Sequence, residues 1–498
     1  MRGLDVVSLT RNLVRHPSVT GSEKKVANYT EKLFQQQFPT SEVHRVGNSV
    51  FVRIPGKNRN VSNRRALVFN GHYDVVPPGK DDLWTMGKPF SARARRVKGE
   101  RVMVGRGTAD MKGGLAAEIC AVKKILSRGK PEHDIWIAAV EDEENDGWGS
   151  RQFSQFIREK GWLATYTGGI SAVIAEPTND MAFWAPASMG HQGFEITFRK
   201  GTEGIWEAAR FTKALHDQRL LWAEMLRAQQ GNTPYELDGA APKATVTNIC
   251  SSGEIDTSCA INQIPPQAYL VLETSNNATR DAVNNGVALY QSRGVAVEVF
   301  EQSNGRFVLN FSSEGGHAAT PDSKRSPAAI DVAAEILCGL EKHKCSLKPL
   351  AFGIGKAPSE LKDVNERAPA VLIDVRLLGG VGVPPKEVLA FLNNQVAVLH
   401  TRMENKFEPL PTFFNDPEKS RIARAIRAVV GEKLACRLFP AACDASYLQG
   451  LGGVFLDTIV VGPGMIERIH KPDEYVRVEA LRQARNLFIN VYEQWAAT

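Results

Sequence analysis

Residues 66–74 have the sequence Ala66-Leu67-Val68-Phe69-Asn70-Gly71-His72-Tyr73-Asp74. The apolar run at the start of this stretch has the character of a buried parallel strand that ends at Gly71. In an open α/β sheet, ligands bind at the carboxyl ends of such strands. We therefore predict that His72 lies at the rim of a crevice, where Asp74 can accept the second ring N–H of the histidine and fix its tautomer. A strand-end His-Asp pair on the surface is the alternative interpretation.

Four further segments place a metal-ligating side chain after an apolar run or a tight glycine turn. The side chains in question are Asp110, the neighbours Glu143 and Glu144, Glu176 and His470. With His72, they supply two imidazoles and at least three carboxylates, which is the inventory of a two-metal hydrolytic site.

Each of these segments also has a purely structural interpretation. Asp110, before the helix expected from about Met111, could be an N-cap aspartate. The acidic run 141–144 could be a solvated surface, although it directly follows an apolar strand at 134–140, where anions repel one another unless a cation neutralises them. Five such segments in one chain favour the metal site.

Composition limits the class of protein. A chain of 498 residues is too long for one core, so two or more domains are expected. No apolar stretch is long enough to span a membrane, and no signal peptide is evident. The seven cysteines fit a reducing cytoplasm. The formal net charge is +6, but the basic residues are dispersed, which argues against a nucleic-acid partner.

Together, the five segments resemble the co-catalytic zinc peptidases and deacylases. This family includes aminoacylase, succinyl-diaminopimelate desuccinylase, acetylornithine deacetylase, glutamate carboxypeptidase, carnosinase and bacterial dipeptidases. The resemblance covers essentially the whole chain. It implies an α/β fold, the phosphorylase/hydrolase-like zinc peptidase catalytic domain with a mixed sheet, interrupted by an α+β lid domain.

The resemblance also implies a role for each site residue. One Zn²⁺ would be bound by His72, Asp110 and Glu176, and the second by Asp110, Glu144 and His470, so that Asp110 bridges the two ions. Asp74 would orient His72, and Glu143 would be the general base. The spacing alone does not distinguish the roles of Glu143 and Glu144. Co²⁺ or Mn²⁺ are expected substitutes for zinc.

We expect a catalytic domain formed by residues 1–190 and 401–498, and a lid formed by residues 191–400. The lid contains what looks like an internal repeat. Residues 193–198 and the helix after them match residues 305–311 and the helix after those, and the strand 269–272 matches the strand 371–376. In this respect the chain resembles bacterial dipeptidases with a doubled lid, whose second half imitates a dimer partner. Chance similarity between amphipathic βα units is the alternative.

Two lid residues are predicted to contact substrate. His317, in the sequence Gly315-Gly316-His317-Ala318, matches the lid histidine of the family and would donate to the developing oxyanion. Arg376 is a candidate clamp for a substrate carboxylate, although a strand-end surface arginine is the alternative. Where related enzymes often have Asp-Ala-Arg, this chain has Asp444-Ala445-Ser446, so that substrate contact is in doubt.

The predicted function is metal-dependent hydrolysis of an amide bond in a small substrate, of the dipeptidase or carboxypeptidase type. An N-acyl-amino-acid deacylase or another small-molecule aminohydrolase is the first alternative. A catalytically inactive metal-binding regulator is a remote one, because it predicts loss of the general base and Glu143 is present. The expected partner is a small peptide or N-acyl amino acid, with no nucleic acid and no membrane. A monomer is favoured for activity, and a homodimer is the alternative.

Overall fold

The computed structural model of the protein describes a large part of the chain. The described residues are 4–498 apart from 59–62, 189, 230–243, 252–262, 265–266, 292–294, 303–304, 314–315, 318–327, 344, 346, 355–368, 378–391, 395–401, 406–412, 415–417 and 451–456. Among them, no helix combines the length and the apolar character needed to cross a lipid bilayer.

The chain divides into two compact units. The first joins the residues up to Gly190 with the C-terminal residues. Its elements are α1 (Val6–Val14), α2 (Lys24–Gln37), β1 (Glu42–Val46), β2 (Ser49–Ile54), β3 (Ala66–His72), β4 (Arg93–Val97), β5 (Glu100–Val104), α3 (Lys112–Ser127), β6 (Asp134–Val140), α4 (Trp148–Glu159), α5 (Trp162–Thr165), β7 (Ile170–Ile174), β8 (Phe183–Ser188), β19 (Phe413–Phe414), α10 (Arg421–Val430), β20 (Ala435–Phe439), α11 (Asp444–Gly450), β21 (Asp457–Val460), β22 (Tyr475–Arg477) and α12 (Val478–Ala497).

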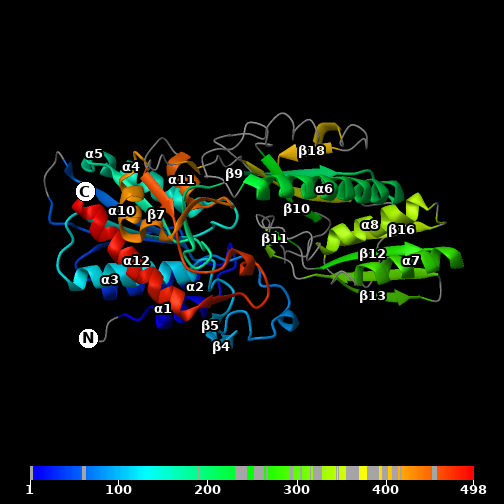
Figure 1. The fold of residues 1–498 in the computed structure, drawn as a ribbon, viewed down its shortest axis with the longest axis horizontal. Helices are drawn as coiled ribbons and strands as arrows, with labels where there is room; N and C mark the ends of the chain where they lie inside the picture. The colour runs from blue at the N-terminus through cyan, green and yellow to red at the C-terminus, as the bar shows by residue number, and fades with distance from the viewer. Residues whose placement is uncertain are drawn as a thin grey trace. The chain divides into compact units, whose positions relative to one another are not determined.

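A nine-stranded mixed sheet forms the centre of the first unit (Figure 1). Its order is β1-β2-β6-β3-β7-β21-β8-β19, and β20 pairs with β8. The four central strands β6, β3, β7 and β21 run parallel to one another. The predicted α/β fold with a mixed sheet is confirmed. Because the four central strands are parallel, their carboxyl ends meet at one edge of the sheet.

The central strands β3, β6 and β7 are buried at every position, because their side chains are mostly apolar on both faces of the sheet. Ile135 and Ile137 of β6 join a core that includes residues of α1, α2, α3 and α12. Trp136, between them, turns the other way and meets Phe153 and Phe156 of α4. Figure 1 shows α1, α3 and α12 packed together on one side of the sheet. Helices therefore cover both faces and leave the carboxyl ends of the strands for the polar loops.

The second unit lies between the two parts of the first in sequence. Its elements are β9 (Gly190–Thr197), α6 (Thr202–Gln229), β10 (Ala244–Ser251), β11 (Gln263–Ile264), β12 (Gln267–Glu273), α7 (Asn277–Gln291), β13 (Ala296–Glu301), β14 (Arg306–Ser312), β15 (Gly316–His317), α8 (Ala329–Lys342), β16 (Lys348–Ile354), β17 (Ala370–Leu377) and β18 (Arg402–Asn405). Since β18 pairs with β9, the second unit extends beyond the boundary expected at residue 400.

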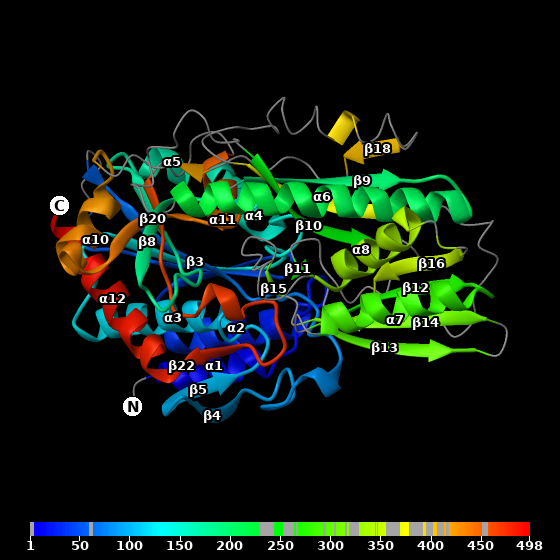
Figure 2. The same ribbon diagram turned by 45° about the vertical axis from the view of Figure 1, so that its right-hand side comes forward.

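Two four-stranded sheets of the second unit have the same topology. Figure 2 shows β12, β13 and β14 of the second sheet side by side. The first has the order β10-β17-β9-β18, and the second has the order β13-β14-β12-β16. In both sheets the first and third strands in the chain are central and the second and fourth are at the edges. All four strands of the second sheet come from the chain between β10 and β17, so one unit of sheet and helices is nested within the other.

The nesting changes which segments correspond to each other. Sequence similarity paired β9 with β14 and β12 with β17. By position in the sheets, however, β9 corresponds to β12, and β17 corresponds to β14. The sequence comparison therefore matched the first strand of one sheet with the third strand of the other in both cases. All four strands are central in their sheets, so their residue patterns are similar and did not distinguish them.

Candidate metal centre

Four of the five candidate ligands lie at or after the carboxyl ends of the central strands, and the fifth, Asp110, comes from a loop outside the central sheet. His72 is the last residue of β3, and Glu144 and Glu176 follow β6 and β7. His470 follows β21, and Asp110 lies between β5 and the start of α3. The helix begins at Lys112, close to the expected position. The four strand-end segments meet because β6, β3, β7 and β21 are parallel neighbours, and the Asp110 loop joins them from outside the central sheet.

The ligand atoms form two groups that share Asp110. His72 Nε2 lies 3.1 Å from Asp110 Oδ1 and 3.6 Å from Glu176 Oε1. On the other side, His470 Nε2 lies 3.0 Å from Asp110 Oδ2 and 3.1 Å from Glu144 Oε2. Ligand atoms about 2.0–2.1 Å from a tetrahedral zinc ion lie about 3.3 Å from one another. The spacing of both groups therefore fits a metal ion, with one carboxylate oxygen of Asp110 facing each position.

Burial and mutual charge determine the protonation of this cluster. All five side chains are buried. Burial raises the pKa of Glu176, and the charge of Asp110 adds to this effect. Burial lowers the pKa of His72, but hydrogen bonds to Asp110 and Asp74 outweigh it and place the pKa well above the usual value. Burial also lowers the pKa of His470, but the charges of Glu144 and Asp110 and hydrogen bonds to them outweigh it and raise the pKa to about 9. In the protein without metal, the neighbouring carboxylates therefore favour a proton on each imidazole.

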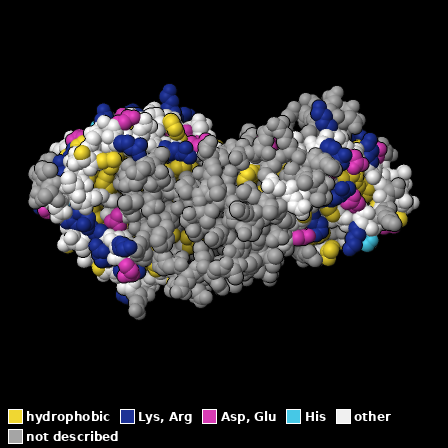
Figure 3. Space-filling model, turned by 90° about the horizontal axis from the view of Figure 1, so that it is seen from above, with side chains coloured by type: hydrophobic (Ala, Val, Ile, Leu, Met, Phe, Trp, Pro, Cys, Tyr) yellow, Lys and Arg dark blue, Asp and Glu magenta, His cyan; other side chains and the backbone are white. Residues whose placement is uncertain are grey.

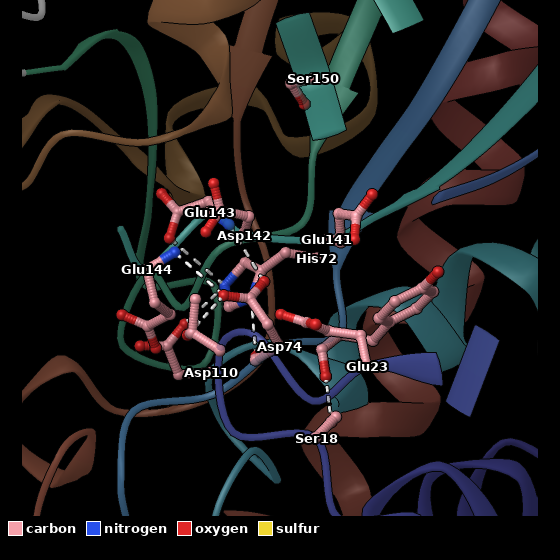
Figure 4. Close-up of polar contacts among 12 residues, drawn as sticks. Ser18, Glu23, His72, Asp74, Asp110, Glu141, Asp142, Glu143, Glu144 and Ser150 are labelled. Atoms are coloured by element: carbon pink, nitrogen blue, oxygen red, sulfur yellow. Dashed lines mark hydrogen bonds and ion pairs between the residues drawn. The ribbon is translucent and has the colours of Figure 1, made fainter. Parts of the chain in front are cut away.

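Asp74 connects His72 with the loop after β6 (Figure 4). His72 Nδ1 donates to the backbone oxygen of Asp74 at 3.0 Å, and the Asp74 carboxylate lies farther away, at 3.4 Å. That carboxylate accepts the backbone N–H groups of Glu143 and Glu144, both at 3.1 Å, and the hydroxyl of Thr20 at 2.9 Å. The expected contact between Asp74 and the ring is thus made mainly by the backbone, while the carboxylate holds the acidic loop.

Glu143 and Glu144 differ in their surroundings. Glu144 belongs to one of the two ligand groups, whereas Glu143 belongs to neither. Glu143 Oε2 lies 3.8 Å from His72 Nε2, and its side chain is 11% exposed, compared with 3% for Glu144. Burial raises the pKa of Glu143 well above its usual value. This carboxylate is therefore beside the ligands, with a path to solvent and a strong affinity for a proton.

Comparisons with known proteins agree with this geometry. The model of peptidase family M20/M25/M40 matches residues 68–494. The chain belongs to this family. A succinyl-diaminopimelate desuccinylase of Maricaulis maris is 30% identical over 205 residues, which cover 39% of this chain and 47% of the relative. The match spans about half the length of such curated relatives.

Solved structures of the M20 fold cover nearly the whole chain. Human carnosine dipeptidase 1 has a TM-score of 0.57 at 13% identity. The match covers 99% of this chain and 97% of the human protein. An M20 family metallo-carboxypeptidase, Sso-CP2 from Sulfolobus solfataricus, has a TM-score of 0.53 at 14% identity, with 99% of this chain and 100% of that chain covered. At these identities the likeness establishes the fold.

The two residues predicted to contact substrate from the lid belong to the second unit. His317 lies in β15, where it pairs with Gln263 of β11. Arg376 lies in β17, opposite Thr245 of β10. The side chains of both residues are outside the part of the chain that the structure describes. Their contacts with substrate remain predictions.

Sequence reasoning missed several buried polar residues of this M20 site. Glu474 accepts the backbone N–H groups of Ala109 and Asp110, and Arg106 pairs with it. Asp444 begins α11 and is fully buried, and burial raises its pKa to about 7. Glu474 stands four residues after His470, and Arg106 stands in the glycine turn before Asp110, so their nearness to ligands in sequence was an available signal.

Proposed function

We propose that this M20 family member is a metal-dependent hydrolase that cleaves an amide bond in a small substrate, of the dipeptidase or carboxypeptidase type. The observation that carries the proposal is the pair of ligand groups that share Asp110, with one further carboxylate, Glu143, beside them. A purely structural cluster does not require a half-buried acid that lies outside both ligand groups. A water-activating site needs one as a proton carrier.

Two Zn²⁺ ions would be held by His72, Asp110 and Glu176 and by Asp110, Glu144 and His470. The donor types support zinc, because imidazole nitrogen and carboxylate oxygen are its common ligands, and Co²⁺ or Mn²⁺ are expected substitutes. When bound, such a pair of ions lowers the pKa of a water molecule and polarises a carbonyl group.

The chain's own residues supply the proton transfers and the positioning. Glu143 would accept the proton of the attacking water and deliver it to the leaving amine, a transfer typically worth about 10²–10⁴-fold in rate. Asp74 holds the backbone N–H of Glu143, which keeps this carboxylate at the edge of the ligand groups. His317 and Arg376 are proposed to contact the oxyanion and a substrate carboxylate.

Deacylation of an N-acyl amino acid is the second candidate, because the same arrangement cleaves any small amide. The similarity to enzymes named succinyl-diaminopimelate desuccinylase supports it. We propose a small peptide or N-acyl amino acid as the substrate and a monomer as the active form, with a homodimer as the alternative. The five cysteines whose side chains the structure describes are free thiols, which supports the cytoplasmic location that we expect.

A substrate panel tests the proposal. Purified protein should hydrolyse members of a set of dipeptides or of acylated amino acids when Zn²⁺, Co²⁺ or Mn²⁺ is present. A chelator should abolish the activity, and re-addition of metal should restore it. Preference between the two substrate sets distinguishes the peptidase from the deacylase. Full activity in a preparation free of metal would refute the proposal, as would binding of two ions without hydrolysis of any member of the panel.

A further inference from the structure

Glu474 makes contacts that reach the backbone of the shared ligand. Its side chain is fully buried. One carboxylate oxygen, Oε1, accepts the backbone N–H of Ala109 at 2.9 Å and that of Asp110 at 3.3 Å. In addition, the backbone oxygen of Glu474 accepts the N–H of Gly105 at 2.8 Å. The segment that follows His470 is therefore bonded directly to the segment that carries Asp110.

Arg106 neutralises Glu474 and extends the connection to a third segment. Its Nη1 donates to Glu474 Oε2 at 2.6 Å and to the backbone oxygen of Lys471 at 3.3 Å. Its Nη2 donates to the backbone oxygen of Pro77, in the loop after His72, at 3.4 Å. The guanidinium also lies 5.6 Å from the centre of the Trp84 ring. One buried cation thus contacts the loops that follow both candidate histidine ligands.

A role in stability alone does not account for this arrangement. A buried ion pair contributes little net stability, and replacing it by apolar side chains of similar volume is often neutral. The contacts here are directed at the peptide groups next to ligands. Groups that orient ligands in this way typically change metal affinity about 10–100-fold when they are altered.

We propose that Glu474 and Arg106 are positioning residues that fix the backbone of Asp110 relative to both histidines, and so set the affinity of the two-metal centre. The inference rests on the proposed function only in taking the two ligand groups to bind divalent ions. The pair does not touch the reacting atoms. It acts through the Asp110 peptide and through the loops of His72 and His470.

The first unit offers a matched control in the pair Arg53 and Asp134. Arg53 Nη2 lies 2.9 Å from Asp134 Oδ2, and both side chains are buried. Asp134 also accepts a backbone N–H, that of Gly56 at 2.8 Å, and Arg53 lies 4.0 Å from the centre of the Trp162 ring. The control pair therefore shares with the Arg106 pair a buried charge contact, a bond to a peptide N–H and an aromatic neighbour, although Arg53 also pairs with Glu42 and Asp134 with Arg64. However, Asp134 begins β6, at the strand end opposite to Glu144.

The experiment measures the affinity of metal-free protein for Zn²⁺ and Co²⁺ by competition with a chelating dye, and the visible spectrum of the Co²⁺ form. Glu474→Gln keeps an oxygen for the N–H groups but leaves Arg106 without its counter-charge. We expect the dissociation constant to rise about 10–100-fold and the Co²⁺ spectrum to change. Asp134→Asn should lower the resistance to urea and leave both the affinity and the spectrum as in the wild type.

Arg106→Lys is a milder second variant, since it keeps a cation but loses the fork that reaches Pro77 and Lys471. We expect a smaller rise in the dissociation constant. Equal metal affinities in the Glu474, Arg106 and Asp134 variants would overturn the inference. So would a failure of both site variants to fold where Asp134→Asn folds, because the pair would then serve folding. These outcomes do not depend on hydrolysis, so an inactive wild-type protein that binds two ions would refute the proposed function separately.

Discussion

Asp74 and Glu474 each accept two backbone N–H groups from a segment that carries a candidate metal ligand, but the cations that face them differ. Glu474 pairs with Arg106, whose charge is permanent. Asp74 faces the ring of His72. A histidine must be neutral to bind a metal ion, so the imidazolium beside Asp74 loses the proton on its Nε2 when metal binds and keeps the Nδ1–H that faces Asp74.

The difference separates two tasks around one site. The Glu474 region, which consists of Glu474 and Arg106, keeps the same charges whether or not metal is present. It can therefore fix the backbone of Asp110 in both states. The Asp74 region, which consists of Asp74, His72 and the backbone of Glu143 and Glu144, changes its charge when metal binds. Asp74 also holds the backbone of Glu143, the proposed proton carrier. We therefore expect changes in the Asp74 region to affect both turnover and metal binding, and changes in the Glu474 region to act through metal binding.

The largest expected effect concerns Glu143, which belongs to the Asp74 region alone. Glu143→Gln should lower kcat by about 10²–10⁴-fold while both metal ions are retained, because the site loses a proton carrier and no ligand. Steady-state kinetics and metal analysis of the same preparation measure the two quantities. Loss of metal in this variant, together with full metal content in Glu144→Gln, would mean that the roles of the two glutamates are reversed.

Substitution of Asp74 tests whether its carboxylate serves two neighbours. In Asp74→Asn, one acceptor oxygen becomes an amide that faces a backbone N–H, so metal affinity should fall about 10–100-fold and kcat should fall with it. Thr20→Val is the control, because it removes only the hydroxyl that donates to Asp74 at 2.9 Å. If both variants lower the affinity equally, the carboxylate has no special role in holding the acidic loop.

The charge difference also predicts how metal binding depends on pH. The pKa of His72 is raised well above its usual value and that of His470 to about 9, so both rings bind protons near neutral pH in the metal-free protein. Each metal ion must displace such a proton. Affinity should therefore rise about tenfold per pH unit for each proton released between pH 7 and 9. Calorimetric titrations in buffers of different ionisation enthalpy count these protons. Binding with no proton release would contradict the assignment.

The smallest expected effect concerns His133, a buried histidine whose ring is not paired with a carboxylate in the way that His72 is. His133 is buried, and its Nδ1 has no hydrogen-bond partner among the described residues. Burial, with Arg65 nearby, lowers its pKa to about 4. Between pH 6.5 and 4 the unfolded chain binds more protons than the folded protein, so this contribution to stability is present above pH 6.5 and is lost as the pH falls. We expect a loss of about 1 kcal/mol between pH 7 and 5.5.

The control for that prediction is the same urea titration of His133→Gln. The variant should show a weaker dependence of unfolding free energy on pH in this range, because it lacks the group that titrates. A dependence identical to that of the wild type would assign the effect to other groups.

The sequence allowed the central sheet to be predicted and the candidate ligand residues to be named because both depend on local patterns, whereas their division between two metal positions came from the family resemblance. An apolar run that ends in a histidine or a carboxylate marks the carboxyl end of a buried strand, as at His72 and Glu176. The contact between Glu474 and the Asp110 peptide joins residues 364 positions apart, so no local sequence pattern predicts it. The correspondence of the repeated strands was also missed, since β9 and β14 have similar alternation but different places in their sheets.

The nesting of the two sheets in the second unit has a consequence for the order of folding. Pairing of Ser251 in β10 with Val371 in β17 closes a loop of roughly 120 residues, and such closure is entropically unfavourable while that loop is unfolded. The inner strands, β12 to β16, pair over shorter separations. Once the inner sheet has formed, it brings its own ends into a compact body and shortens the loop that the outer sheet must close. We therefore expect folding from the inside outward, with the outer strands completing the unit last.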